Sequence, residues 1–154
     1  MQTIISEESM DISSIIDQIE QQLREQDAIY HNVATNYGLS DTALWVLYIL
    51  NAAEGDCTQQ DLIRKCSAPK QTVNSAVASL ARKGFLTLEM IPGTRNLKRI
   101  LPTEEGKTLL QSCVQPMRQA EIRAFEQLSE EELRLYLELT RRITSNLRKE
   151  LDNL

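Results

Sequence analysis

Five polar side chains in one short segment have the types and spacing needed to read the base edges of duplex DNA. They lie near the start of residues 69–83 and are Lys70, Gln71, Thr72, Asn74 and Ser75. Amine, amide and hydroxyl groups of this kind donate and accept hydrogen bonds in the major groove. No acidic residue occurs from residue 69 to 84, whereas a solvated helix face often carries Glu and Lys pairs. The composition therefore favours contact with a polyanion.

A helix must position these groups, and the apolar pattern of the same segment predicts one. Val73, Val77 and Leu80 recur at helical spacing, so they form a buried stripe opposite the polar side chains. Pro69 is expected in the first helical turn, and Gly84 is expected to end the helix. The small residues of the outer face would let such a helix enter the groove, which is about 12 Å wide.

Two further helices are expected ahead of it. Ser40 is a suitable cap for a helix that supplies core residues and the chain's one tryptophan, Trp45, and ends near Gly55. Thr58 with Asp61 three residues later predicts a short capped helix, and a tight turn then leads to the polar segment. The order is that of a helix-turn-helix unit.

A two-stranded hairpin is predicted directly after the polar helix. Residues 85–88 and 97–101 are predicted to form two short strands on either side of a Pro-Gly turn. The turn carries Arg95, with Lys98 and Arg99 behind it, and such cations contact backbone phosphates or the minor groove. Exposed basic hairpins are also common as a means of keeping proteins soluble. The hairpin alone is therefore a weak signal for DNA binding, and it supports that interpretation only together with the preceding helix.

The charge of the chain is unevenly distributed. The 154 residues carry a net charge of −5, yet residues 58–107 hold nine basic and four acidic side chains, so the acidic excess lies outside this segment. A basic centre between acidic ends is expected where one face alone meets a polyanion. A chance fluctuation would give the same pattern.

Long helices are predicted at both ends of the chain. Apolar residues recur at helical spacing over residues 12–37, and the segment closes at Gly38. A second helix is expected over residues 103–128, bent by Pro116. A third begins at a capping box, Ser129 with Glu132, and continues with a coiled-coil-like seam.

These end helices are longer and more apolar than a small winged core requires. We therefore expect one chain, 1–154, in which a winged helix-turn-helix core at 40–102 is flanked by dimerisation helices at 12–37 and 103–151. The predicted fold class is mainly α with a small β-hairpin wing. An intramolecular helical bundle is the alternative to a dimer.

Other kinds of chemistry lack the residues they need. Three cysteines, Cys57, Cys66 and Cys113, have no C-x-x-C spacing, and His31 is the one histidine, so no disulfide framework, metal site or cofactor is expected. No nucleophile, base and acid set or phosphate loop indicates an enzyme. Without an apolar run of about 20 residues or a signal sequence, we expect a cytoplasmic protein.

Two strings of the sequence resemble a known family. PKQTVNSAVASLARKGFL at 69–86 and PTEEGKTLL at 102–110 are similar to the recognition helix and post-wing helix of the MarR family of bacterial transcriptional regulators, and the pattern of helices agrees from about residue 12 to 150. The resemblance implies a ligand-responsive homodimeric repressor that binds a pseudo-palindromic operator in double-stranded DNA. The implied DNA contacts are Pro69, Lys70, Gln71, Thr72, Asn74, Ser75, Arg95 and Lys98. Family wings usually carry an Asp before the arginine, where this chain has Thr94.

The resemblance also implies an effector, commonly a small aromatic or lipophilic molecule bound between the dimerisation helices and the winged core. Tyr30, Tyr37, Trp45 and Met117 are candidates for such a site, and each is equally suited to ordinary core packing. Two alternatives remain open: a redox-responsive regulator that uses a cysteine such as Cys57 or Cys66, and a winged-helix protein-interaction adaptor without specific DNA binding.

Overall fold

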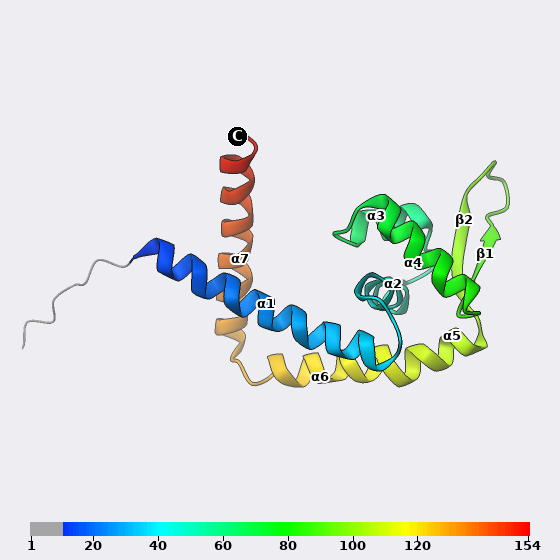
Figure 1. Cartoon of the computed structure of the whole chain (residues 1–154), viewed down its shortest axis with the longest axis horizontal. Coiled ribbons are helices and arrows are strands. Elements are labelled where there is room, and N and C mark those ends of the chain that lie inside the picture. Colours follow the sequence, from blue (N-terminus) through cyan, green and yellow to red (C-terminus); the bar gives the residue numbers. More distant parts are fainter. Residues whose placement is uncertain (1–10) are drawn as a thin grey trace, which may run out of the picture. The chain divides into compact units, whose positions relative to one another are not determined.

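A computed structural model describes residues 11–154, which fall into two compact units, one ending at Leu110 and one of Gln111–Leu154. The first holds α1 (Ile12–Asn36), α2 (Asp41–Asn51), α3 (Gln59–Lys65), α4 (Lys70–Arg82), β1 (Leu86–Met90), β2 (Lys98–Pro102) and α5 (Glu104–Leu109) (Figure 1). A π-helical turn, Leu110–Val114, leads to α6 (Gln115–Phe125) and α7 (Glu130–Leu151). The predicted class, mainly helical with a hairpin wing, is confirmed. Within residues 11–154 no helix is long and apolar enough to cross a bilayer.

The core of the first unit lies where α2, α3 and α4 meet. Its side chains that are at most 2% exposed include Leu44 and Leu47 of α2, Leu62 of α3, and Val73, Val77 and Leu80 of α4. The predicted apolar stripe of α4 is therefore the buried one. Burial of a side chain of this size stabilises the fold by about 1.5–3 kcal/mol, so this packing fixes which face α4 turns outward.

Local capping determines where these helices begin. The Thr58 hydroxyl accepts from the Asp61 N–H at 3.2 Å, and the Asp61 carboxylate accepts from the Thr58 N–H at 2.9 Å. Ser40 accepts from the Ala43 N–H in the same way. Gly38, at φ +64°, ends α1 in the left-handed conformation that glycine adopts readily. All three predicted boundaries are confirmed.

The hairpin is attached to the helix pair by backbone contacts. β1 and β2 are antiparallel, with Leu88 opposite Ile100, and Ile100 is buried. The Ile100 N–H donates to the Cys57 carbonyl at 2.8 Å, and Thr58 forms a bridge with Arg99. β2 is therefore paired with the residues just before α3, which sets the wing beside the start of that helix.

Two predicted features differ in detail. Pro69 is the N-cap of α4, with ψ 142°, and not part of its first turn; proline's φ suits both positions, and the extended ψ places it outside the helix. The single bent helix predicted at 103–128 is interrupted by the π-helical turn just before Pro116 and ends at Phe125. Because proline has no N–H, the regular ladder cannot continue through it. Leu128, predicted on the buried side, is 44% exposed.

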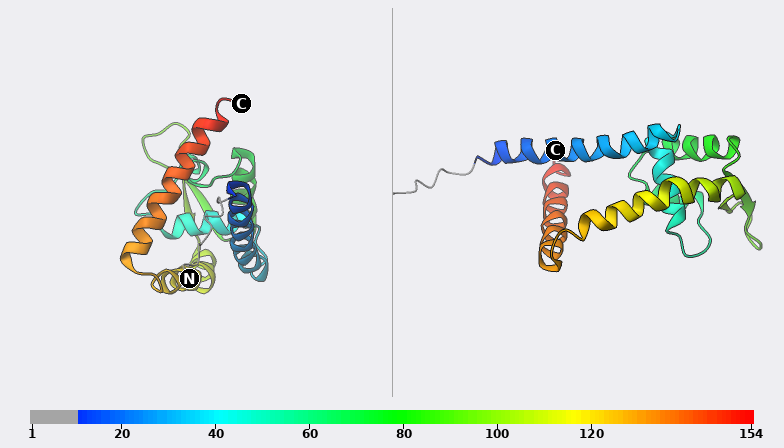
Figure 2. Two further views of the ribbon diagram at one scale, coloured as in Figure 1. Left: turned by 90° about the vertical axis from the view of Figure 1, so that its left-hand side faces the viewer. Right: turned by 90° about the horizontal axis from the view of Figure 1, so that it is seen from below.

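Each unit carries a long helix with exposed apolar residues. The right-hand view of Figure 2 shows most of α1 running clear of the winged core, and Ile12, Ile16 and Leu23 are at least 49% exposed. In the second unit, α6 and α7 meet at a sharp corner, where Ser129 and Glu132 form the predicted capping box. No residue of α7 is buried.

Candidate nucleic-acid interface

The outer face of α4 presents the polar side chains that the sequence singled out. Lys70, Gln71, Thr72 and Ser75 are exposed, whereas the opposite stripe of the helix is buried in the core. The small side chains along this outer face leave the backbone of α4 close to the protein surface. The structure thus brings together on one helix face four of the eight residues expected to contact DNA.

Asn74 lies on the same helix but is only half-exposed, because a side chain from α3 holds it. The Gln59 amide Nε2 donates to Asn74 Oδ1 at 2.6 Å. Gln59 is the first residue of α3 and is also half-buried. Sequence reasoning missed Gln59, since the two residues are fifteen positions apart and no local pattern joins them.

The start of α4 has no side-chain cap. Pro69 occupies the N-cap and provides no hydrogen-bonding side chain, and the first helical bond runs from the Val73 N–H to the Pro69 carbonyl at 3.1 Å. The N–H groups of Lys70, Gln71 and Thr72 precede the helical ladder. Such groups, with the positive end of the helix dipole, favour an anion. The polar face therefore begins at an electropositive helix end.

The basic side chains near this face differ in whether they are paired. Within residues 11–154, Lys70, Arg95 and Lys98 form no ion pair, and all three are exposed. By contrast, Arg64 pairs with Asp61 at 2.5 Å. Lys70 lies on α4, and Arg95 and Lys98 lie on the wing, so this face keeps positive charge that is not neutralised by an ion pair.

Arg99, grouped with the wing cations from the sequence, has a different role. Its guanidinium contacts Glu89 at 3.0 Å and Asp56 at 3.2 Å. Hydrogen bonds to these two carboxylates raise the pKa of Arg99 above its ordinary value. Arg99 therefore ties the wing, near the turn end of its strands, to the loop before α3, and its charge is paired within the protein.

A polar hollow lies where α3, α4 and the wing come together. Its volume is about 240 Å³, and its lining includes Gln59, Lys70, Asn74, Asn96 and Lys98. Amides and cations from three elements thus converge on one recess. Groups in this arrangement can contact a phosphate and a neighbouring base edge together.

A second feature is a cluster of aromatic residues on α1 and α2. Trp45 lies between two tyrosines, with ring centroids 5.0 Å from Tyr30 and 5.4 Å from Tyr48. Of the other effector candidates, Tyr37 is 43% exposed at the end of α1, and Met117 is buried and belongs to the second unit. The structure therefore brings two of the four candidates, Tyr30 and Trp45, into contact.

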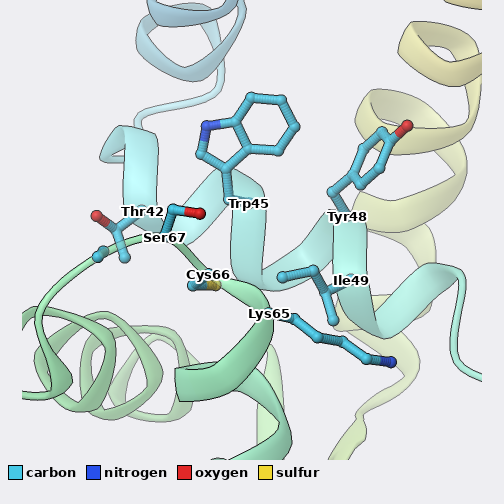
Figure 3. A pocket seen from close by; sticks show the side chains of 8 residues that line it. Thr42, Trp45, Tyr48, Ile49, Lys65, Cys66 and Ser67 are labelled. Carbon is cyan, nitrogen blue, oxygen red and sulfur yellow. The ribbon is translucent and has the colours of Figure 1, made fainter. Parts of the chain in front are cut away.

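A cavity of about 420 Å³ adjoins this cluster, between α2 and the turn that leads into α4. Figure 3 shows Trp45, Tyr48 and Ile49 coming from α2. The other side is formed by Lys65 and residues 66–68. Its volume falls within the range of roughly 300–1,000 Å³ usual for small-molecule sites. Trp45 is the one predicted effector residue in the lining; Tyr48 was missed, although its spacing of three from Trp45 placed it on the same side of α2.

The cysteines lie in environments that suppress thiol reactivity. Cys57, Cys66 and Cys113 are each at most 5% exposed and form no disulfide. Burial raises the pKa of all three thiols above the ordinary value. Reactive cysteines have the opposite character, a lowered pKa and access to solvent. Among residues 11–154, no group of three or more His, Cys, Asp or Glu could hold a metal ion.

Comparison with known proteins finds one matching family model. Residues 37–95, which span α2 to the wing, match the model of the MarR family. Among curated proteins, none matches the chain in sequence.

Solved structures with the same fold span nearly the whole chain. A MarR protein from Peptoclostridium difficile superimposes with a TM-score of 0.69 at 14% identity, over 97% of each chain. Bordetella bronchiseptica BpsR, whose DNA binding is regulated by 6-hydroxynicotinic acid, gives 0.66 at 19% identity, over 85% of this chain and 98% of its own. An organohalide-sensing transcriptional regulator with bound 2,4-dichlorophenol gives 0.63 at 15% identity, over 97% of this chain and 89% of its own.

Proposed function

We propose that this chain, which matches the MarR-family model at residues 37–95 and has the fold of MarR transcriptional regulators, is a sequence-specific repressor. In this proposal it binds operator DNA as a homodimer and responds to a small aromatic ligand. The observation that carries the proposal is the surface around α4. There an uncapped helix start, an outward polar face and unpaired cations of helix and wing occur together.

In the proposed complex, α4 enters the major groove. Lys70 and the N–H groups of the first turn bind backbone phosphates, while Gln71, Asn74 and Ser75 reach base edges. Arg95 and Lys98 bring the wing to the adjacent backbone or minor groove. Thr72 lies on the same exposed face and contributes a hydroxyl contact.

The dimer is proposed from the apolar residues left uncovered on α1 and α7. On α7, Leu137, Leu147 and Leu151 are 49%, 53% and 58% exposed, and the sequence spacing puts them on one seam. Monomeric proteins rarely leave apolar surface of this extent open, and a second copy offers a matching surface by two-fold symmetry. A two-fold dimer would present two α4 helices to half-sites about 34–36 Å apart.

Light scattering tests the dimer. At micromolar concentration we expect twice the chain mass of 17.6 kDa. Leu147→Glu should shift the protein towards monomer, whereas Ser145→Glu, which adds the same charge away from the seam, should not. A wild-type monomer would contradict the shared-helix arrangement.

Ligand response is proposed for the cavity beside α2. Its aromatic and aliphatic lining suits a planar ring, and the Lys65 ammonium suits an acidic substituent. Because residues 66–68 form one side and lead directly into α4, a bound molecule would alter the start of the reading helix. A tenfold loss of operator affinity needs only about 1.4 kcal/mol of preference for the DNA-incompetent state.

Trp45 makes the ligand test direct, since it is the chain's one tryptophan and lines the cavity. We expect 6-hydroxynicotinic acid or 2,4-dichlorophenol, the ligands of two structural neighbours, to change its fluorescence saturably and to release DNA. Lys65→Met should weaken the acid more than Lys107→Met, which alters a lysine on α5. No fluorescence change with either compound would count against this cavity.

DNA binding is tested by fluorescence anisotropy with a duplex from upstream of the chain's own gene and a scrambled duplex of equal length. We expect tighter binding to the first, and affinity that falls steeply with salt because phosphate neutralisation releases counterions. Lys70→Ala should weaken binding to both duplexes and reduce the salt slope by about one. Affinity indifferent to sequence and to salt would instead favour a protein-interaction adaptor.

A further inference from the structure

The hydrogen bond between Gln59 and Asn74 links α3 and α4, the two helices of the helix-turn-helix unit, at the surface proposed to contact DNA. Gln59 Nε2 lies 2.6 Å from Asn74 Oδ1. Both residues line the polar hollow between α3, α4 and the wing, and both are half-buried. Asn74 therefore remains reachable from outside while one end of its amide is already engaged.

Gln59 is held firmly enough to orient its partner. It follows Thr58, whose side chain and backbone form the capping box with Asp61. Thr58 also forms a bridge with Arg99, which is itself bound to two carboxylates. The backbone just before Gln59 is thus held by contacts with both α3 and the wing. The side chain of Gln59, whose amide bonds Asn74, therefore extends from a fixed backbone position.

The polarity of this bond decides what Asn74 can offer to a base. An unconstrained asparagine reads adenine with both ends of its amide, accepting from N6 and donating to N7. When Oδ1 accepts from Gln59, the Nδ2 group is the end left to face the groove, and it only donates. Guanine presents two acceptors there, N7 and O6, whereas adenine presents one acceptor and a donor.

We propose that Gln59 is a specificity-determining residue, which fixes the Asn74 amide so that it donates to guanine in preference to adenine at one position of each operator half-site. The inference rests on the proposed DNA binding and deepens it. Gln59 acts through Asn74 as a positioning residue. A purely structural role, fastening α3 to α4, would instead affect stability and leave base preference unchanged.

Replacing the glutamine by a group of opposite polarity tests the proposal. In Gln59→Glu the carboxylate only accepts, so Asn74 must turn its Nδ2 group towards residue 59 and its Oδ1 towards the groove. Selection from a random duplex library should then shift the preferred base at one position from guanine towards adenine, by about tenfold. Asn74→Ala identifies that position, because its preference there should be flattened.

Two further variants make the result decisive. Gln60→Glu places the same charge on the neighbouring exposed residue, and should lower affinity for all sequences without changing the preferred base. Gln59→Met removes the donor at similar length, and should relax the preference without inverting it; this variant carries the test if Gln59→Glu fails to fold, as judged by circular dichroism.

The outcomes separate this inference from the proposed function. If the wild type selects a sequence and the Gln59 variants select the same base as strongly, the inference is overturned and the DNA-binding proposal stands. If the wild type selects adenine at the Asn74 position, the inference is also overturned. A wild type that selects no sequence overturns the proposed function, and the inference with it.

Discussion

Gly106 of α5 lies close to the backbone of Phe85, which follows α4, and we expect Gly106→Ala to destabilise the protein. A Cβ at this position would lie 2.0 Å from the Phe85 carbonyl oxygen and 3.2 Å from the Pro102 Cβ. Gly106 is helical, with a negative φ that alanine adopts without strain. The expected effect is therefore steric.

The carbonyl cannot easily move aside. The Phe85 oxygen accepts from the Thr103 N–H at 3.0 Å, and the Phe85 N–H donates to the Leu80 carbonyl at 3.0 Å. Ordinary carbon–oxygen contacts are about 3.3–3.6 Å, so the corner must open by more than about 1 Å. That movement stretches the bond from Thr103, which holds the wing's last strand against the end of α4.

The magnitude follows from three opposing effects. Overpacking of this kind costs about 1–3 kcal/mol, and loss of the Thr103 hydrogen bond costs about 1 kcal/mol more. Exchange of glycine for alanine inside a helix returns about 1 kcal/mol. We expect a net loss of about 2 kcal/mol in the free energy of unfolding, opposite in sign to the usual effect of this substitution in a helix.

Urea unfolding followed by circular dichroism measures this change, at matched protein concentration because dimerisation would contribute to stability. Lys107→Ala is the control, since it alters the next residue of α5 on the exposed side, where its ion pair with Glu104 contributes little. A Gly106→Ala protein as stable as the wild type, or more stable, would show that the close approach does not exist.

Three further predictions concern charge and thiol chemistry. Arg95→Ala should weaken DNA binding about equally on cognate and random duplexes, whereas Arg99→Ala should lower the melting temperature because Glu89 and Asp56 lose their shared partner; the reverse pattern would contradict the assignment. Hydrogen bonds from Thr58 lower the pKa of Asp61 below its ordinary 3.8, so its contribution is present above that value and is lost as pH falls through the lowered pKa. Acid titration should therefore cost the wild type more stability than Asp61→Asn, and parallel curves would refute this. The buried thiols of Cys57 and Cys66 should react with a disulfide reagent only slowly until the protein is unfolded, and rapid labelling of the native protein would restore the redox alternative.

Local signals in the sequence predicted much of the helix-turn-helix unit formed by α3 and α4. The spacing of Val73, Val77 and Leu80 identified the buried side of α4, because helix periodicity and burial are properties of neighbouring residues. Thr58 and Asp61 predicted the start of α3 for the same reason. Pro69 was placed one position too far into α4, since proline's φ is the same inside and outside a helix and ψ alone distinguishes them.

Long-range contacts were beyond the reach of such signals. The partner of Asn74 comes from another helix, and Arg99 finds carboxylates on β1 and in the loop before α3. Sequence alone gave both residues the same DNA-facing chemistry as their neighbours. Their pairing depends on the packing of α3 against α4 and on the register of the hairpin, which no short motif specifies.

The start of α4 is the point at which fold and proposed function make opposite demands. Side-chain caps begin the other helices that follow an irregular segment, from Asp11, Ser40, Thr58, Thr103 and Ser129. Such a cap contributes about 1 kcal/mol, yet it occupies an N–H group that a phosphate would otherwise bind. With Pro69 at this position, α4 forgoes that stabilisation and relies on its buried stripe, so its first N–H groups remain available to an anion. The proposed DNA surface thus follows the usual exchange of stability for function.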